Sequence, residues 1–253
     1  MKKCMMAALV LGLAVSASAA EKKTKAVKAE EPAQKAWTTA LNLGLTLTDG
    51  NSETLAVNGS LVTEGEREGL GSLLAGAEVN YGENTVDGVE ETTVENAKAY
   101  VNVKKTLSPR TFVSLDSSVR YDDVAAIDYR ALLGPGLGFY ALKNDKHELS
   151  LEAGPSYVWG KIGGLKEDYL ALRFAERFTC QMLPNAKLVQ SLEYVPEAED
   201  FDNYRITAEA GVEAAMSDRL SLRVVLQDQY VNLPAEGKER NDLSLIAGVG
   251  LTL

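Results

Sequence analysis

Apolar and polar side chains alternate along most of the chain between residues 37 and 253. In residues 37–48 the odd positions include Trp37, Leu41 and Leu47, whereas the even positions are small or polar. Successive side chains of a β-strand point to opposite faces, so this alternation predicts a strand with one apolar face. The same counting predicts twelve strands, near residues 37–48, 53–64, 70–81, 93–104, 111–122, 129–140, 148–159, 168–180, 188–196, 203–215, 220–231 and 242–253.

These segments have the length and number expected of a barrel in a bacterial outer membrane. A tilted strand needs about 9–11 residues to cross the hydrocarbon layer, and single-chain bacterial barrels have an even number of strands. Turn-forming sequences such as DGNS (49–52), LPN (183–185) and MSDR (216–219) separate the segments. The predicted fold is therefore all-β: an antiparallel up-and-down transmembrane β-barrel of about twelve strands with short loops, occupying residues 37–253.

The aromatic residues support a membrane location. Membrane barrels concentrate aromatic side chains on the lipid-facing side at the two water interfaces. If both chain ends are periplasmic, Trp37, Phe139 and Phe178 fall near the inner ends of their strands. The aromatic residues assigned to the apolar faces near the outer ends are Tyr81, Tyr121, Tyr129, Tyr157, Trp159, Tyr169, Tyr194, Tyr204 and Tyr230.

The first 36 residues differ in composition from the rest of the chain. Residues 1–20 combine Lys2 and Lys3 with an apolar run and small residues up to Ala20, which is the layout of a cleaved signal peptide. Residues 21–36 are rich in Lys, Glu and Ala and indicate a flexible periplasmic leader; a plug or a cell-wall contact is the alternative. After cleavage Cys180 is the only cysteine, so the sequence predicts no intramolecular disulfide.

The charge of the chain limits its partners. The full chain has 26 basic and 36 acidic residues, and loss of Lys2 and Lys3 leaves 24 basic residues and a formal charge of −12. This charge argues against nucleic acid and favours cations, which we expect at the acidic outer loops. Outer-membrane lipid and lipopolysaccharide are the other expected partners. The sequence leaves the oligomeric state open, and we take a monomer as the starting assumption.

Charged residues within the predicted strands fall mainly on the face opposite the apolar one. A lipid-facing Arg or Lys costs about 2–4 kcal/mol at the bilayer midplane, so these charges are expected to face the lumen. They either pair and close the lumen, or line a water-filled path and select ions. A barrel of about eight strands is filled by side chains and one of about sixteen strands is open, so a barrel of twelve strands can have either a closed or an open lumen. The candidate lumen-lining residues are Glu78, Lys98, Asp116, Arg120, Glu152, Arg173, Glu193, Arg205, Glu209, Glu213 and Arg223.

Two prolines in neighbouring predicted strands are unusual, because proline removes a hydrogen bond from the ladder. Pairing around a turn near Asp145 places Pro135 opposite Pro155, with Gly134, Gly136, Gly138 and Gly154 beside them. A bulged bend is the first interpretation. A bare strip that receives a loop, the leader or a solute is the second.

Candidate chemistry is sparse. Serine or thiol catalysis usually needs a positioned base, and His147, the only histidine, falls in a predicted periplasmic turn. Cys180 is expected to act as a small hydrophobic residue. The stretch EAEDFDN (197–203) offers oxygen ligands but lacks the spacing of a calcium loop, so we expect a solvated acidic loop, bridged to lipopolysaccharide by divalent ions. We expect no enzyme activity, no cofactor and no metal site.

Four segments also resemble a known family: LNLGLTLTDGNSETLAVN (41–58), LGPGLGFYAL (133–142), LEAGPSYVWG (151–160) and, most specifically, residues 192–231 with the EY-P and NYR elements. They are similar to the YdiY-like family, domain of unknown function 481, whose members are described as salt-induced outer-membrane proteins. The resemblance implies an outer-membrane β-barrel and supplies no established activity or site. The chain departs from most such barrels by ending in Leu253 rather than an aromatic residue.

These observations lead to one expectation with two alternatives. We expect an outer-membrane barrel that serves as a narrow channel or as an envelope component of the osmotic or salt response. The first alternative is a closed barrel that stabilises the membrane or docks a partner. The second is a lipid-modifying hydrolase, which would need an acid–base pair at a membrane interface.

Overall fold

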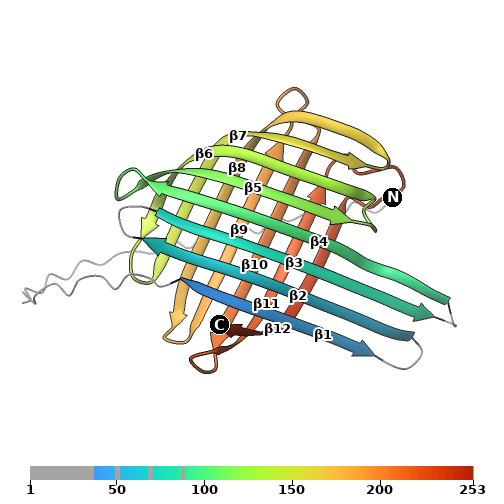
Figure 1. Ribbon diagram of the computed structural model, residues 1–253, viewed down its shortest axis with the longest axis horizontal. Helices are drawn as coiled ribbons and strands as arrows, with labels where there is room; N and C mark the ends of the chain where they lie inside the picture. Colours follow the sequence, from blue (N-terminus) through green and yellow to red (C-terminus); the bar gives the residue numbers. More distant parts are fainter. Residues whose placement is uncertain (1–36, 49–51, 68–70, 87–88, 253) are drawn as a thin grey trace, which may run out of the picture. The chain divides into compact units, whose positions relative to one another are not determined.

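The computed structural model describes residues 37–48, 52–67, 71–86 and 89–252, so the predicted signal peptide and leader lie outside the described residues. Twelve strands are present in the described part of the chain (Figure 1). They are β1 (Thr38–Thr48), β2 (Ser52–Arg67), β3 (Gly71–Val86), β4 (Val89–Thr106), β5 (Thr111–Asp122), β6 (Ile127–Lys143), β7 (His147–Ile162), β8 (Leu165–Leu183), β9 (Ala186–Pro196), β10 (Tyr204–Ala215), β11 (Leu220–Val231) and β12 (Asn241–Thr252).

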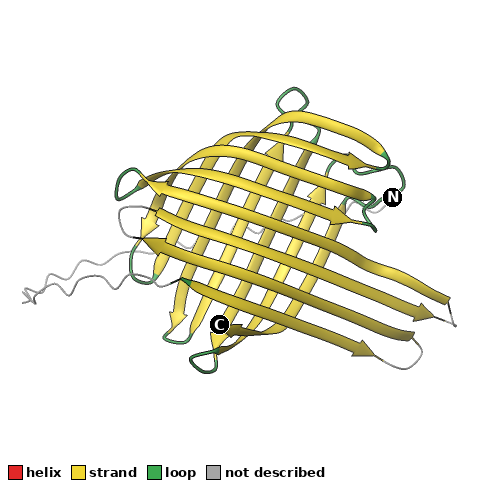
Figure 2. Ribbon diagram, in the orientation of Figure 1, coloured by secondary structure: helices red, strands yellow, loops and turns green. Residues whose placement is uncertain are grey.

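The strands form a closed antiparallel barrel in chain order, with β12 returning to β1 (Figure 2). Closure leaves no open sheet edge, which a barrel in lipid requires because unpaired backbone groups there are costly. The seam is short: β1 and β12 pair over residues 40–43 and 249–252, whereas β1 and β2 pair along the whole of β1. We call the end that holds the start of β1 and the end of β12 the terminal end, and the opposite end the far end. The arrowheads of β1 and β3 mark the far end at the right of Figure 1.

The predicted fold class is confirmed, and the two largest differences from the predicted strand bounds lie at the far end. β3 continues to Val86 and β4 begins at Val89, so Glu83, Glu90 and Glu91, which the sequence places in an outer loop, lie in strands. Beyond the hydrocarbon layer both faces of a strand meet water. The alternation that marks a strand in the sequence is lost there.

The turn between β7 and β8 shows why several connections are short. It consists of Gly163 and Gly164, with φ angles of 57° and 80°. Two consecutive residues with positive φ make the tight hairpin turn that matches the twist of paired strands, and glycine adopts this conformation without strain. The loop expected near residues 160–168 is therefore a two-residue turn.

The two faces of each strand are chemically different. Side chains such as Leu61, Val79, Leu137 and Leu245 point outward and are largely exposed, whereas charged and amide side chains of the opposite parity line the interior. A soluble barrel would bury its apolar face, so an exposed apolar face indicates that the barrel is surrounded by lipid. No helix that is long and apolar enough to cross a membrane occurs in the described ranges.

The proline pair lies in a break in the ladder rather than at a bulge. β6 and β7 pair on both sides of the break, at Leu133↔Tyr157 and Leu137↔Ala153, in one continuous register. Pro135 is therefore opposite Pro155, as predicted. The prediction of a bulged bend was wrong at this position, because the register shifts between β6 and β7 occur at residues 127–129 and 140–142 instead.

Candidate functional site: the lumen of the barrel

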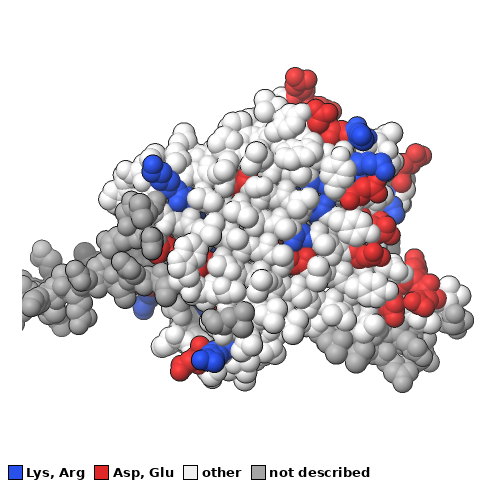
Figure 3. Space-filling model, viewed as in Figure 1, with Lys and Arg blue, Asp and Glu red and all other residues white. Residues whose placement is uncertain are grey.

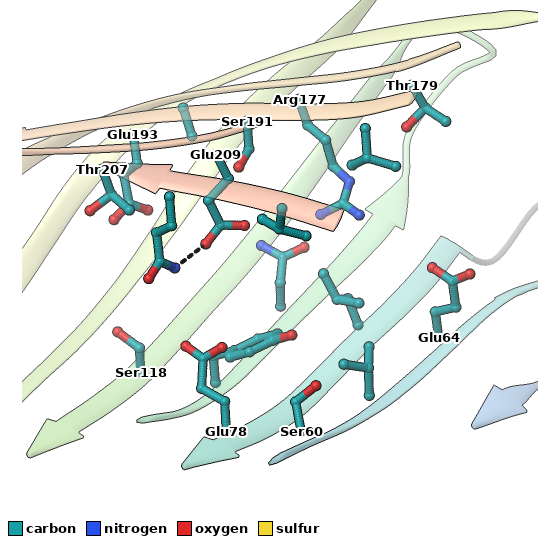
Figure 4. Close-up of a pocket in the computed structure, with 18 of the residues that line it drawn as sticks. Ser60, Glu64, Glu78, Ser118, Arg177, Thr179, Ser191, Glu193, Thr207 and Glu209 are labelled. Carbon is teal, nitrogen blue, oxygen red and sulfur yellow. Dashed lines mark hydrogen bonds between the residues drawn. The ribbon is translucent and has the colours of Figure 1, made fainter. Parts of the chain in front are cut away.

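A cavity of about 740 Å³ lies inside the barrel and is lined by residues of all twelve strands. It extends from Lys146 and His147 at the terminal end to Arg120, Arg130 and Gln229 near the far end. Figure 4 shows polar side chains from opposite walls pointing into one space, with Glu78 on one side and Glu209 on the other. Side chains therefore narrow the interior but do not fill it.

Arg173 of β8 is the centre of an ion-pair network in this lumen. Its guanidinium nitrogens lie 2.6 Å from Glu193, 3.4 Å from Asp116 and 3.5 Å from Glu152. The Arg173 side chain is 13% exposed, and the Glu152 side chain 6%. Charges that are this buried need partners, because an unpaired one would carry most of its desolvation cost.

The network bridges strands that are not neighbours. The Lys104 ammonium on β4 lies 2.5 Å from Glu152 on β7, although β5 and β6 separate these strands. Ser114 of β5 also donates a hydrogen bond of 3.0 Å to Glu152. The inner wall beneath this bridge belongs to β6, where the small residues Gly136 and Gly138 leave room for it.

The glycine strip is covered by the barrel's own side chains. A Cβ atom added to Gly138 would lie 2.3 Å from the ring of Phe112 and 3.0 Å from Glu152. At Gly154 an added Cβ would lie 2.1 Å from the backbone oxygen of Pro135. Phe112 and Glu152 thus fill space that the sequence left open to a loop, the leader or a solute.

An apolar cluster lies on the same side of the lumen, toward the far end. It consists of Leu132, Val158, Ala171 and Val195, which come from β6 to β9 and are at most 3% exposed. Tyr169 packs against this cluster and accepts a hydrogen bond from Arg130. The assignment of Tyr169 to the lipid-facing aromatic belt was therefore wrong. Tyr169 has the same parity as Arg173 on β8, and that parity faces the lumen.

The wall formed by β11, β12, β1, β2 and β3 is less crowded. Its inward side chains are mostly small or neutral, and Asn42 donates a hydrogen bond of 3.1 Å to Ser60. The pair between Lys98 and Glu78 at its border is loose, at 3.8 Å, and about a third exposed. The charged residues of this wall that line the cavity include Glu64, Glu78 and Arg223.

The structure brings most of the candidate lumen-lining residues together. Glu213 points inward and lies 3.4 Å from Lys187, but it is not part of the cavity wall. The candidates that line the cavity are Glu78, Lys98, Asp116, Arg120, Glu152, Arg173, Glu193, Arg205, Glu209 and Arg223.

Sequence reasoning missed five cations that line the cavity: Lys146 in the turn between β6 and β7, and the strand residues Lys104, Arg130, Arg177 and Lys187. The parity of each strand carried the signal, since Lys104 is in phase with Lys98 on β4. The pairing of Lys104 with Glu152 was not readable from the sequence, because this contact joins strands that β5 and β6 separate.

The outer face carries an aromatic row. Phe174, Tyr194, Tyr204 and Tyr230 follow one another on β8 to β11, with ring centroids 5.6–6.3 Å apart. Near the terminal end, the ring of His147 stacks on Phe178 at a centroid distance of 6.3 Å. Aromatic side chains thus lie on the lipid-facing side near both ends.

A carboxylate of β8 lies on the apolar outer face. Glu176 of β8 has the outward parity of Phe174 and Phe178, and it borders a groove of about 360 Å³ lined mainly by apolar residues. The expectation that strand charges face the lumen was wrong for this residue. Its i+2 and i−2 neighbours are aromatic, so only strict counting of positions would have revealed it.

The far end is acidic, as the red side chains at the right edge of Figure 3 show. In the loop 197–203, Asn203 donates a hydrogen bond of 2.8 Å to Glu197, and the backbone N–H of Asp202 donates one of 3.0 Å to Asp200. These loop carboxylates are thus held partly by the loop itself. Among the described residues, no group of three or more His, Cys, Asp and Glu is arranged to hold a metal ion.

Comparison with known proteins gives the family of this chain. The model of the family "Protein of unknown function, DUF481" matches residues 41–253. The chain belongs to this family. No curated protein is similar enough to the chain to match it.

Solved structures with the same fold are outer-membrane barrels. The NanC porin structure has a TM-score of 0.53 at 11% sequence identity, with 85% of this chain and 100% of that chain covered. The COG4313 outer membrane channel from Pseudomonas putida F1 has a TM-score of 0.51 at 8% identity, with 89% and 100% covered. At these identities the likeness establishes the barrel fold.

Proposed function

We propose that the protein is an outer-membrane channel for ions and small polar solutes. The observation that carries this proposal is the polar cavity of about 740 Å³, which is lined from all twelve strands and extends from the terminal-end turn to the far end. The apolar outer face and the predicted signal peptide support a location in the outer membrane.

The solute path in this proposal runs beside the less crowded wall of β11, β12 and β1 to β3. The ion-pair network around Arg173 narrows the other side and remains in place during passage. The acidic far end attracts cations to the mouth, and this attraction weakens with salt because the screening length falls below about 8 Å above physiological ionic strength.

Single-channel recording of the refolded mature protein in a planar bilayer tests the proposal. We expect steady conductance that Ser60→Trp reduces by about half or more, because residue 60 lines the cavity on the less crowded wall. Leu61→Trp is the matched control: the neighbouring residue is exposed on the outer face, so conductance should stay at the wild-type level. A folded barrel that carries no current would support a closed barrel that stabilises the membrane or docks a partner.

A role in the salt response is a second part of the proposal and rests on the family resemblance. It predicts that cells grown at high salt contain more of this protein in the outer membrane than cells grown at low salt. Equal amounts in quantitative immunoblots of the two membrane fractions would contradict it.

A further inference from the structure

Three cations lie in one cross-strand row on the inner wall near the far end. Lys98 of β4 is directly opposite Arg120 of β5, and Arg120 is directly opposite Arg130 of β6. All three line the cavity. Directly opposite side chains have Cβ atoms only about 4.5–5.5 Å apart, and like charges at such positions destabilise a sheet. The row therefore needs compensation by negative charge.

The described side chains supply this compensation unevenly along the row. Lys98 has a loose ion pair with Glu78, and Arg120 has a close one with Asp122. Arg130 is only 7% exposed, and it has no ion pair with any described carboxylate: it donates a hydrogen bond to the neutral Tyr169 hydroxyl. Its Nε atom is buried and has no acceptor among the described residues. Arg130 is thus a buried charge whose donors are incompletely used.

A fourth cation reaches the same region from another wall. Arg205 of β10 lines the same cavity as Arg120 and Arg130. Its carboxylate partner Glu193 lies 3.7 Å away and is shared with Arg173, which is closer at 2.6 Å. Four cations therefore share this part of the lumen with three paired carboxylates, Glu78, Asp122 and Glu193, and Arg130 is the cation without a carboxylate partner among the described residues.

We propose that Arg120, Arg130 and Arg205 form a binding site for small organic oxyanions, with a carboxylate or phosphate group seated against Arg130. Guanidinium groups present planar sets of donors that match carboxylate and phosphate oxygens. The Tyr169 hydroxyl accepts from Arg130 and keeps its own hydrogen to donate to the anion. The use of this site during solute passage rests on the proposed channel function, whereas binding itself does not.

The test measures binding by thermal unfolding of the full mature barrel in a neutral detergent. Inorganic phosphate and acetate are the probes, each compared with sodium chloride of equal ionic strength. A ligand that binds only the folded state raises the unfolding midpoint. We expect both probes to raise the wild-type midpoint, and Arg130→Gln to weaken phosphate binding at least fivefold.

A second readout separates a binding site from a structural role. In chloride alone, Arg130→Gln should unfold at the same temperature as the wild type or higher, because it relieves repulsion within the row. An arginine that only stabilises the barrel would lower the midpoint when replaced. Arg177→Gln is the matched control, because Arg177 lines the same cavity but lies far from the row. On β8 the residue level with the row is Glu167, which pairs with Gly160 opposite Arg130, and Arg177 lies ten residues further along that strand. It should leave phosphate binding unchanged.

Undiminished phosphate binding by Arg130→Gln would overturn the proposal, as would the absence of any phosphate effect on the wild type. If Arg130→Gln does not fold, Tyr169→Phe replaces it, with the same loss of phosphate binding expected. Recording with phosphate in the bilayer chamber distinguishes this proposal from the channel function. Conductance that phosphate does not reduce would contradict the use of this site during solute passage and leave the channel, whereas a silent barrel that binds phosphate would contradict the channel and leave the site.

Discussion

The two walls of the lumen differ in the contacts that their inward side chains make. The wall of β4 to β8, which we call the crowded wall, holds the Arg173 network, the glycine strip and most of the apolar cluster. The wall of β11 through β3, the open wall, holds neutral side chains such as Asn42 and Ser60 in simple hydrogen bonds. In the proposed channel, the crowded wall therefore stabilises the barrel and the open wall leaves room for solutes.

Replacing the centre of the network should give the largest effect. Arg173→Met leaves Asp116, Glu152 and Glu193 without their shared partner, and removing one member of a buried ion pair costs about 3–5 kcal/mol. Urea unfolding of the barrel in lipid vesicles measures the change. Lys187→Met is the control, because its pair with Glu213 is about a third exposed and should be worth about 0–1 kcal/mol. Equal losses in the two variants would remove the distinction between buried and solvated pairs.

A methyl group in the glycine strip should have the next largest effect. In Gly154→Ala the added Cβ meets backbone atoms, with Pro135 oxygen at 2.1 Å and Gly136 Cα at 2.8 Å. Backbone cannot turn away as a side chain does, so we expect a loss of about 3 kcal/mol in unfolding free energy. Gly59→Ala on the outer face meets only Leu43 and Val79, both at 3.7 Å, and should stay within about 0.5 kcal/mol of the wild type. An unchanged unfolding curve for Gly154→Ala would show that the strip tolerates side chains.

The smallest effect is expected on the outer face. Glu176→Leu removes a carboxylate from the apolar band and should raise the unfolding free energy by about 1 kcal/mol, since a lipid-facing charge is costly. Glu95→Leu is the contrast, because Glu95 accepts a hydrogen bond of 3.1 Å from Tyr121 near the far end and should bring no gain. A loss of stability in Glu176→Leu would indicate that Glu176 binds something in its groove.

The sequence was sufficient for the fold because strand parity is a local property. Alternation placed all twelve strands, and the same alternation placed Arg173 and Glu152 inside the barrel. It was not sufficient for the site, because Lys104 and Glu152 meet only when the sheet curves across two intervening strands. Tyr169 was misplaced for another reason: a tyrosine ring fits either lipid or a buried apolar cluster, so residue type alone did not decide its side.

The short pairing between β1 and β12 has a consequence for the assembly of the barrel. Every other pair of neighbouring strands is consecutive in the chain and can form as a hairpin. The seam instead joins strands from opposite ends of the barrel sequence, and it pairs them only over residues 40–43 and 249–252. Bringing such distant segments together costs more chain entropy than forming a hairpin, and fewer hydrogen bonds offset that cost. We therefore expect closure at this seam to be the last and slowest step of folding, and its opening to be the first step of unfolding.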